Sequence, residues 1–286
     1  MRFNIYHQPL CGNVQSEFYN LYKQASGWLR LLARSEIRIK ILTSLNDGSK
    51  NLGELREVLD LSSSTILHSM RDMEIEGLIE NTNAGYTLTN VGRIQAILLH
   101  DLIKAIAVLS KDKDFWLTHD LSGIPDHLLK RFWELSDCEI MMATPDDLLK
   151  PFSKYTQQIM KAKEMKGVSP VFHPDFPNVM NILLNKKTDV ELIITRKVAT
   201  KIMGAHRGLL ENSTAEPNFR LWVTDEDLNV NFTVTESAFS MGLFRNDGIF
   251  DISIDLFAYA SDALNWGRDL FEYYRKRSQI VKIDDI

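Results

Sequence analysis

Histidines with acidic or basic neighbours could carry acid–base chemistry, and two segments of the 286-residue chain hold them. His173-Pro174-Asp175 could orient a general base, or it could form a strand-to-helix turn in which Asp175 caps the next helix. Ala205-His206-Arg207-Gly208 is expected to form a loop. The sequence has no Gly-rich phosphate loop, no GxSxG and no HExxH. We therefore expect no enzyme activity, no catalytic residue, no cofactor and no metal site.

Another group of polar side chains could contact DNA. Hydroxyls at 62–65 can cap the helix that follows, and the outward residues of this helix and of the hairpin after it are candidate contacts. These candidates are Ser63, Ser64, Thr65, His68, Ser69, Arg71, Asn81 and Asn83. The helix start lacks the Arg, Asn or Gln that reads guanine or adenine bidentately, and the hairpin tip lacks Lys and Arg. We expect modest affinity per protomer, so that dimerisation is needed.

Basic residues before this segment recur at helical spacing. Arg30, Arg34 and Arg38 are four residues apart and are expected to line one helix face. On one interpretation Arg34 and Arg38 contact DNA phosphates, which position a protein without reading sequence. On the other, the face is solvated and pairs with Glu36 and its neighbours.

The elements that would hold these residues lie between Ser35 and Arg93. Ile37, Ile41 and Leu45 recur every four residues, as on one face of a helix. Two further apolar faces follow at 52–61 and 66–73, the second ended by Gly77, and the polar tip 81–85 joins two short strands. This order predicts a winged helix-turn-helix at 30–93, whose second paired helix enters the DNA major groove.

Two more helices are expected around this domain. Residues 1–29 are expected to form an amino-terminal arm and helix, with order uncertain at 1–16 and an apolar stripe from Phe18 to Leu32. The segment 91–110 is apolar on more than one face, so it must be buried on more than one side. It is either a dimer helix or a plain core helix within a linker at 94–122. In a two-fold dimer the recognition helices would lie about 34 Å apart.

The remainder, 123–286, is expected to be an α/β domain with a mixed sheet. Strands alternate with helices, which favours a largely parallel sheet covered on both faces, with antiparallel additions. The expected strands are 138–143, 167–172, 189–195, 219–224, 229–235 and 238–244. The expected helices are 145–163, 178–185 and 196–203, followed by a last helix that Ser261 caps. The overall fold class is thus a winged helix-turn-helix followed by an α/β domain.

Ligands of open α/β sheets bind beyond the carboxyl ends of the strands. That rule predicts an effector site near the ends of three strands in the second domain. Its candidate residues are Phe172, His173, Phe176, Arg196 and Trp222, with Arg196 facing an anionic ligand. In the alternative interpretation, each of these aromatic residues is an ordinary residue of the hydrophobic core.

Composition fits a soluble cytoplasmic protein that is not inserted in a membrane. Hydrophobic residues make up 44% and charged residues 25%, and no apolar run approaches the roughly 18 residues of a membrane span. Cys11 and Cys138 are far apart and have no metal-binding spacing, as expected for reduced thiols. The net charge is −5, whereas a DNA-binding protein is expected to carry a basic patch.

Four strings in the chain resemble the archaeal methanogenesis regulatory proteins. They are FWLTHDLSGIP at 115–125, SPVFHPDFP at 169–177, SMGLF at 240–244 and WGRDLFEYY at 266–274. The resemblance covers about 30–286 and implies an archaeal transcriptional regulator with an ArsR-like winged helix. It also implies a sensory domain related to phospholipase-D-like folds. The HxKx4D motif of those enzymes is missing, since the hairpin 229–236 has neither His nor Lys, so hydrolysis would have been lost.

These observations predict a homodimeric transcriptional regulator that binds double-stranded DNA through its winged helix. The α/β domain would sense a small-molecule effector. In a first alternative this domain is only a protein-docking or dimerising module. In a second, the protein is a phosphodiesterase that the winged domain targets to its substrate.

Overall fold

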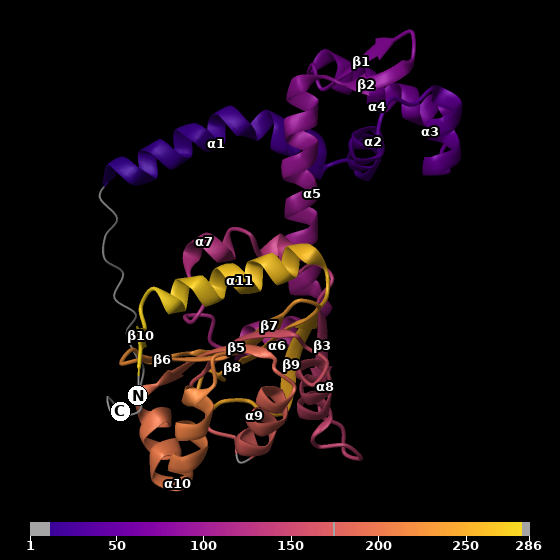
Figure 1. The fold of residues 1–286 in the computed structure, drawn as a ribbon. Coiled ribbons are helices and arrows are strands. Elements are labelled where there is room, and N and C mark those ends of the chain that lie inside the picture. Colours follow the sequence, from indigo (N-terminus) through magenta and orange to yellow (C-terminus); the bar gives the residue numbers. More distant parts are fainter. Residues whose placement is uncertain (1–11, 174, 282–286) are drawn as a thin grey trace. The chain divides into compact units, whose positions relative to one another are not determined.

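The computed structural model describes residues 12–173 and 175–281, and the chain folds as two compact units. The division falls between Asp101 and Leu102, within one helix (Figure 1). It lies earlier than the expected start of the second domain at 123, because Val108, Phe115 and Trp116 belong to the core of the C-terminal unit. The segment 1–11 of the expected arm, including Cys11, lies outside the described residues.

The N-terminal unit has the element order predicted for a winged helix-turn-helix. Its elements are α1 (Gly12–Ala33), α2 (Glu36–Asn46), α3 (Leu52–Leu59), α4 (Ser63–Ile75), β1 (Ile79–Thr82), β2 (Gly85–Leu88) and α5 (Asn90–Lys111), the last of which continues into the second unit. Its core lies between α2, α3, α4 and the hairpin, and Ile41, Leu55, Ile66 and Met73 are fully buried there.

Caps fix where these helices begin. Asn51 and Glu54 form a capping box at the start of α3, and the Ser62 hydroxyl accepts a hydrogen bond from the backbone N–H of Thr65 in α4. Ser35 caps α2 in the same way, with extended backbone. Because α1 ends at Ala33, Arg30 and Arg38 stand on different helices, and the expectation of one continuous basic face is wrong.

The hairpin is tighter than expected. Thr82 pairs with Gly85, so the turn is formed by Asn83 and Ala84, and Asn81 lies within β1. Lys50 forms an antiparallel bridge with Tyr86 of β2, in which the two residues exchange backbone hydrogen bonds of 3.0 and 2.9 Å. Gly85 has a φ of +105°, and a Cβ there would lie 2.7 Å from the carbonyl oxygen of Lys50. Only glycine allows this close approach.

The C-terminal unit is a mixed sheet with helices on both faces. Its elements after α5 are α6 (Lys113–Thr118), α7 (Asp126–Leu129), the 3-10 helix η1 (Phe132–Leu135), β3 (Glu139–Met142), α8 (Lys150–Ile159), β4 (Glu164–Ser169), α9 (Phe176–Asn185), β5 (Asp189–Thr195), α10 (Arg196–Ala215), β6 (Phe219–Thr224), β7 (Val230–Thr235), β8 (Phe239–Leu243), β9 (Ile254–Ala258), α11 (Ser261–Arg275) and β10 (Gln279–Ile280).

The eight strands of this sheet run in the order β10-β6-β5-β4-β7-β8-β9-β3. Only β4, β5 and β6 pair in parallel, and every other pair is antiparallel. The expectation of a largely parallel sheet is therefore wrong, although the mixed sheet itself is confirmed. The reason is that β7, β8 and β9 follow one another without intervening helices, and β9 was not predicted at all.

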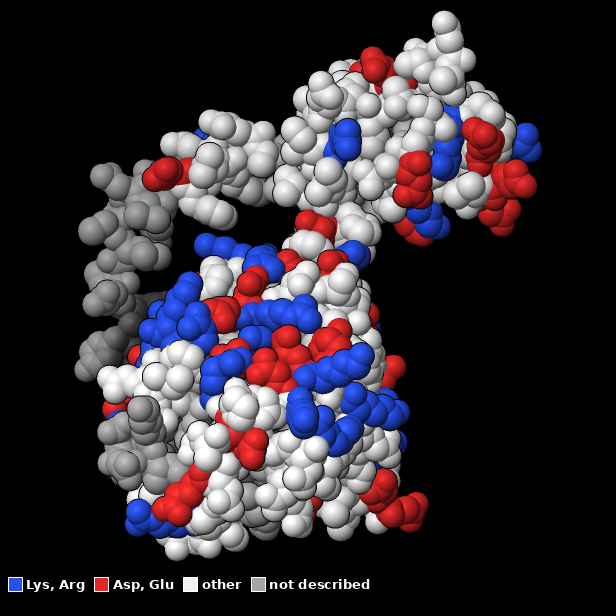
Figure 2. All heavy atoms as spheres, viewed as in Figure 1, with Lys and Arg blue, Asp and Glu red and all other residues white. Residues whose placement is uncertain are grey.

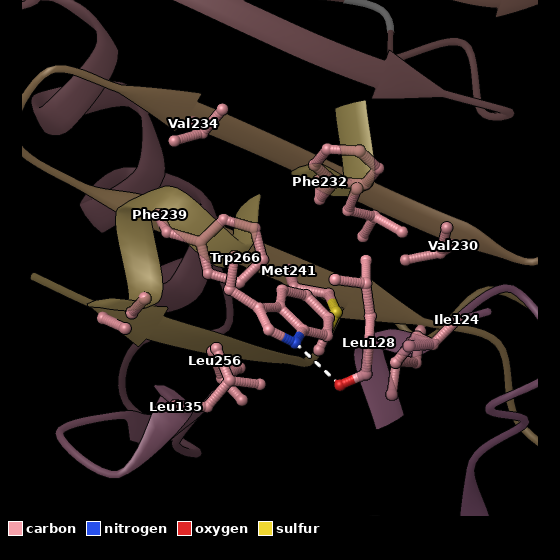
Figure 3. Close-up of a cluster of buried hydrophobic side chains, with 14 of the residues drawn as sticks. Ile124, Leu128, Leu135, Val230, Phe232, Val234, Phe239, Met241, Leu256 and Trp266 are labelled. Carbon is pink, nitrogen blue, oxygen red and sulfur yellow. Dashed lines mark hydrogen bonds between the residues drawn. The ribbon is translucent and has the colours of Figure 1, made fainter. Parts of the chain in front are cut away.

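Helices α7 and α11 cover one face of the sheet, and α8, α9 and α10 lie on the other (Figure 1). On the α11 side, Trp266 is fully buried against Phe239, and its indole N–H donates a 3.0 Å hydrogen bond to the carbonyl oxygen of Leu128 (Figure 3). This core continues through the apolar residues of β7, β8 and β9. Cys138 belongs to it, and burial raises the pKa of its thiol to about 11.

Several expected boundaries are corrected. Residues 205–208 form part of α10 rather than a loop, although His206 has non-helical dihedral angles that kink the helix. Ala260 occupies the N-cap of α11, with Ser261 as its first residue, so Ser261 does not cap it. The strand 189–195 is confirmed with both ends correct.

Gly92, in the first turn of α5, should be sensitive to a single added methyl group. A Cβ there would collide with the carbonyl oxygen of Leu78, whereas a Cβ at Gly27 in α1 would meet nothing within 4 Å. We expect Gly92→Ala to destabilise the N-terminal unit by about 1–3 kcal/mol through overpacking. Gly27→Ala, the matched control, should be neutral or stabilising by up to about 1 kcal/mol. Urea unfolding followed by circular dichroism measures both, and equal effects would contradict the packing described.

Candidate DNA-binding surface and ligand pocket

The outer face of α4 holds most of the predicted DNA contacts. Ser64, His68 and Arg71 are exposed, and Ser63 and Thr65 are half-buried at the start of the helix. Ser69 is only 6% exposed, because it lies on the inward face with Ile66, Met70 and Met73. The expectation that Ser69 faces outward is therefore wrong.

The hydroxyls at the start of α4 bond to one another. The Ser62 Oγ lies 3.0 Å from the Ser64 Oγ and 2.8 Å from the Thr65 Oγ1. Ser62 caps the helix, and the hydroxyls of Ser64 and Thr65 each bond to it, but Ser64 is exposed whereas Thr65 is half-buried. Of the three hydroxyls, Ser64 is the one best placed to contact another molecule.

Arg38 serves the packing of the unit. Its guanidinium donates to the carbonyl oxygen of Leu31 over 3.1 Å and forms an ion pair with Asp72 of α4. Its side chain is only 19% exposed. We therefore assign Arg38 to the packing of α2 on α4 rather than to phosphate contact. Arg34, between α1 and α2, is exposed.

The remaining charge of the N-terminal unit is mixed. Asn81 and Asn83 are exposed on the hairpin. Much of the visible face of this unit is uncharged, and its acidic and basic side chains are intermixed rather than gathered by sign (Figure 2). Lys40 of α2 pairs with Glu36 over 2.7 Å. Phosphate contact by this surface would thus depend on a few Lys and Arg side chains that do not form a continuous basic patch.

A pocket of about 430 Å³ lies in the C-terminal unit, between the sheet and the helices α8 and α9. Its floor comes from β4, β5, β7, β8 and β9, and its wall from α8, α9 and the segments that follow β4 and β8. Pockets of roughly 300–1,000 Å³ accommodate small organic ligands. The size of this pocket therefore suits a metabolite.

The pocket exists because the antiparallel strands carry polar or small residues on this face. In β7, Asn231 and Thr233 point to the pocket, while Phe232 between them is buried in the core beside α11. Ser240 and Gly242 in β8 and Asp255 in β9 continue the same face. Successive side chains of a strand point to opposite sides, so one alternation supplies both the core and the pocket.

Aromatic rings form much of the wall. The rings of Phe152 and His173 stack with centroids 4.0 Å apart, and the Tyr155 hydroxyl lies 3.4 Å from the Thr233 Oγ1. Burial lowers the pKa of His173, against the raising effect of Asp175. The His173 Nδ1 accepts a 3.1 Å hydrogen bond from the backbone N–H of Asp175, so the neutral ring carries its proton on Nε2.

Asp255 is the one acidic residue among the described lining residues. Its Oδ1 atom is buried without a hydrogen-bond partner. A Cβ on Gly242 would lie 2.5 Å from this oxygen, so the backbone of β8 approaches it as closely as glycine permits. Burial, and secondly the negative charge of Asp251, raise the pKa of Asp255 to about 7.

The pocket includes some of the predicted effector residues. Phe172 and His173 line it, whereas the side chain of Phe176 lies outside the described part of the structure. The predicted effector roles of Arg196 and Trp222 are wrong for this pocket, because neither residue lines it. Arg196 pairs with Asp225, and Trp222 packs against the core on the α11 side with Arg275 over its ring.

Two further features of the pocket differ from the sequence interpretation. Asp175 holds the N-cap position of α9 but makes no side-chain cap bond, and its carboxylate instead accepts from Asn178 over 2.7 Å. The polar floor from β7 to β9 was not predicted. One signal for it is present in the sequence: Asp255 is a lone carboxylate between Ile254 and Leu256, which is unusual in a buried strand.

Comparison with known proteins places the chain in a family. Residues 27–107 match the N-terminal domain of the methanogenesis regulatory protein FilR1, and residues 148–277 match its middle domain. A curated relative of that name, from Methanothrix harundinacea strain 6Ac, is 31% identical over 264 residues, which cover 90% of this chain. The chain belongs to the FilR1 family of methanogenesis regulatory proteins. It spans 59% of the length of that curated relative.

Two solved structures are distantly similar. TrmBL2, described as an archaeal chromatin protein with a novel mode of DNA binding, is 9% identical, with a TM-score of 0.41 over 90% of this chain and 99% of that one. Phosphatidylserine synthase from Haemophilus influenzae Rd KW20 is 11% identical, with a TM-score of 0.42 over 52% of this chain and 41% of that one. Both likenesses are too distant to bear on the function of this FilR1-family chain.

No helix in ranges 12–173 and 175–281 is long and apolar enough to cross a membrane. Within the same ranges, no three His, Cys, Asp or Glu side chains gather as a metal site would require.

Replacement of Asp255 should change how stability depends on pH. Its pKa rises from 3.8 to about 7 on folding, so its contribution to stability is full below pH 3.8 and is lost as pH rises toward 7. Asp255→Asn stays neutral, so its free energy of unfolding should be flatter between pH 4 and 8. At pH 8 it should exceed that of the wild type by on the order of 4 kcal/mol.

Denaturant unfolding at several pH values measures this difference. Asp225→Asn, which removes an exposed carboxylate paired with Arg196, serves as the control and should keep the wild-type profile. A wild-type profile for Asp255→Asn as well would show that this carboxyl does not retain its proton in the folded protein.

Proposed function

We propose that this FilR1-family chain is a transcriptional regulator that binds double-stranded DNA as a homodimer and responds to a small molecule. The observation that carries the proposal is the exposed outer face of α4 in a helix-turn-helix followed by a β hairpin. In such units the second paired helix lies in the major groove. Membership in a family of regulatory proteins supports the same function. A regulator of this kind would act in the cytoplasm, and we propose no catalytic activity for it.

Dimerisation is supported by α5. Its residues Ile94, Leu98, Leu102 and Ile106 recur every four positions, and all four are more than half exposed. Val91 and Leu109 extend this apolar stripe, which has no partner among the described residues. Such a continuous apolar face on a soluble protein marks an interaction site. A second copy of the same helix, related by a two-fold axis, would cover it with a self-complementary surface.

Helix α1 offers a second apolar surface. Phe18, Leu21 and Tyr22 are at least half exposed, whereas Leu32 near the end of the helix is buried in the core of the unit. The C-terminal end of the helix is therefore anchored in the core of the unit. We propose that the exposed part of this helix widens the dimer.

The C-terminal pocket supports sensing. It combines a metabolite-sized volume with polar groups that converge on it from neighbouring strands. A ligand shifts a regulator between two states only when it binds one of them more tightly. The mechanism we propose therefore needs two dimer states that differ in the shape of this pocket.

One observation favours a second function for the N-terminal unit. Leu67 and Ile75 on α4 are 41% and 76% exposed, and Lys plus Arg equal Asp plus Glu, ten of each, over residues 1–100. A partly apolar recognition helix, in a segment whose positive and negative charges balance, suits protein binding as well as DNA. Salt dependence separates these functions, because phosphate contacts release counterions and apolar contacts do not.

DNA binding is tested by gel shift with the DNA upstream of the gene. Between 50 and 200 mM salt we expect affinity to fall steeply, by roughly 10³-fold if about six phosphates are contacted. Arg34→Ala should weaken binding to all sequences alike and reduce the salt slope by about 1. Ser64→Ala and His68→Ala should change the sequence preference instead. A complex that is insensitive to salt, or the absence of any complex, would favour protein binding.

Dimerisation is tested by sedimentation of a charged variant of α5. Leu98→Glu combined with Leu102→Glu places two carboxylates in the apolar stripe, so we expect a monomer with at least about tenfold weaker DNA binding. His100→Glu, an exposed position on the same helix outside the stripe, is the control and should stay dimeric. A dimer that survives the double substitution would place the interface elsewhere.

A further inference from the structure

The pocket of the C-terminal unit has an unusual balance of charge. Its described lining residues include one carboxyl, Asp255, and no Lys or Arg. His173 is its basic residue, and burial lowers the pKa of that ring, so it stays neutral at pH 7. A buried negative ligand needs a cation or several N–H donors for compensation. The lining therefore disfavours an anionic ligand.

A cation outside the lining, Lys201, does not change this conclusion. The Lys201 Nζ lies 5.2 Å from the ring centroid of Phe172, and Lys201 itself is not part of the pocket wall. Its position shows instead that an ammonium group already lies against one of the aromatic rings of the wall. Aromatic faces attract cations through their quadrupole.

The Asp255 carboxyl needs a partner that the protein does not supply. Its buried Oδ1 has no hydrogen-bond donor, and the closest backbone, at Gly242, leaves no space for a side chain. Leaving a buried polar group unsatisfied costs roughly 1–3 kcal/mol. Asp255 also lines the pocket, so a positively charged donor bound there against the carboxyl would compensate its burial most strongly.

We propose that this pocket binds an organic cation, an ammonium group on an apolar or aromatic body, with the ammonium at Asp255. The proposal rests on the sensing role proposed above and names the ligand class of the same site. Asn231, Thr233 and Ser240 supply further oxygen acceptors on the floor, which suits the several N–H groups of an ammonium. Phe152, Phe172 and Phe250 supply the aromatic wall.

Binding of the cation would be linked to a proton. An ammonium favours the ionised carboxyl. The affinity of the protein for the cation should therefore rise with pH through about 7, the pKa of Asp255 in the ligand-free protein. The other titratable groups near this carboxyl are Asp251, which is negative, and Tyr155, whose pKa burial raises so that it remains neutral. A neutral ligand would gain nothing from the ionisation.

The test uses calorimetry on the full chain with three probes that share one bicyclic body. Tryptamine carries an ammonium, tryptophol a hydroxyl and indole-3-acetate a carboxylate. We expect tryptamine to bind at least about tenfold more tightly than tryptophol and the carboxylate not to bind. Asp255→Asn should remove the preference for the amine, and the control Asp225→Asn, outside the pocket, should keep it.

Several results would overturn the proposal. They are equal or tighter binding of indole-3-acetate or tryptophol, no binding of tryptamine at millimolar concentration, and an unchanged tryptamine affinity in Asp255→Asn. If Asp255→Asn does not fold, the pH dependence of tryptamine binding to the wild type tests the proposal instead. Its tryptamine affinity should be several-fold higher at pH 8 than at pH 6, and a flat profile overturns the proposal.

The promoter gel shift on the same preparation separates this proposal from the proposed function. Amine binding without any DNA complex leaves the cation site standing and refutes the regulator. A salt-sensitive DNA complex formed by a protein that shows no preference for the amine leaves the regulator standing and refutes the cation site.

Discussion

The alternation of side chains along β7, β8 and β9 is the constraint on which the C-terminal unit depends. Each strand is covered on both faces, so all of its residues are buried except Asn231 and Asp255, which are partly exposed. One face presents Phe232, Met241 and Leu256 to the core beneath α11. The other presents Asn231, Ser240 and Asp255 to the pocket. A slip of one residue in the pairing would exchange these faces and destroy both the core and the site together.

Much of the fold could be predicted from the sequence, because apolar periodicity is a local signal. It located the helices of the N-terminal unit and the strand from Asp189 to Thr195 with both ends correct. It failed for β9, where Asp255 interrupts the apolar run, and for the loop expected around His206, which is a kink inside a long helix. Pairing direction failed too, since it depends on contacts distant in sequence.

The candidate sites were harder to predict than the fold. Phe172 and His173 were found because they follow a parallel strand, as the rule for open sheets requires. Arg196 and Trp222 obey the same rule but serve an ion pair and the opposite core. In the N-terminal unit the spacing of Arg38 suggested phosphate contact, yet its partner Asp72 is distant in sequence and was not predictable by spacing. Three-dimensional pairing decides the role of each of these residues.

The floor and the wall of the pocket are built from different kinds of structure. Asn231 lies opposite Gly242, and Thr233 opposite Ser240, in the antiparallel register of two central strands. Backbone hydrogen bonds on both sides of β7 hold these residues in place. The wall comes from the helices α8 and α9 and from the segments that follow β4 and β8. Rearrangement on binding of the proposed ligand would therefore arise in that wall, so a conformational signal leaving the pocket would travel through helices and loops rather than through the sheet.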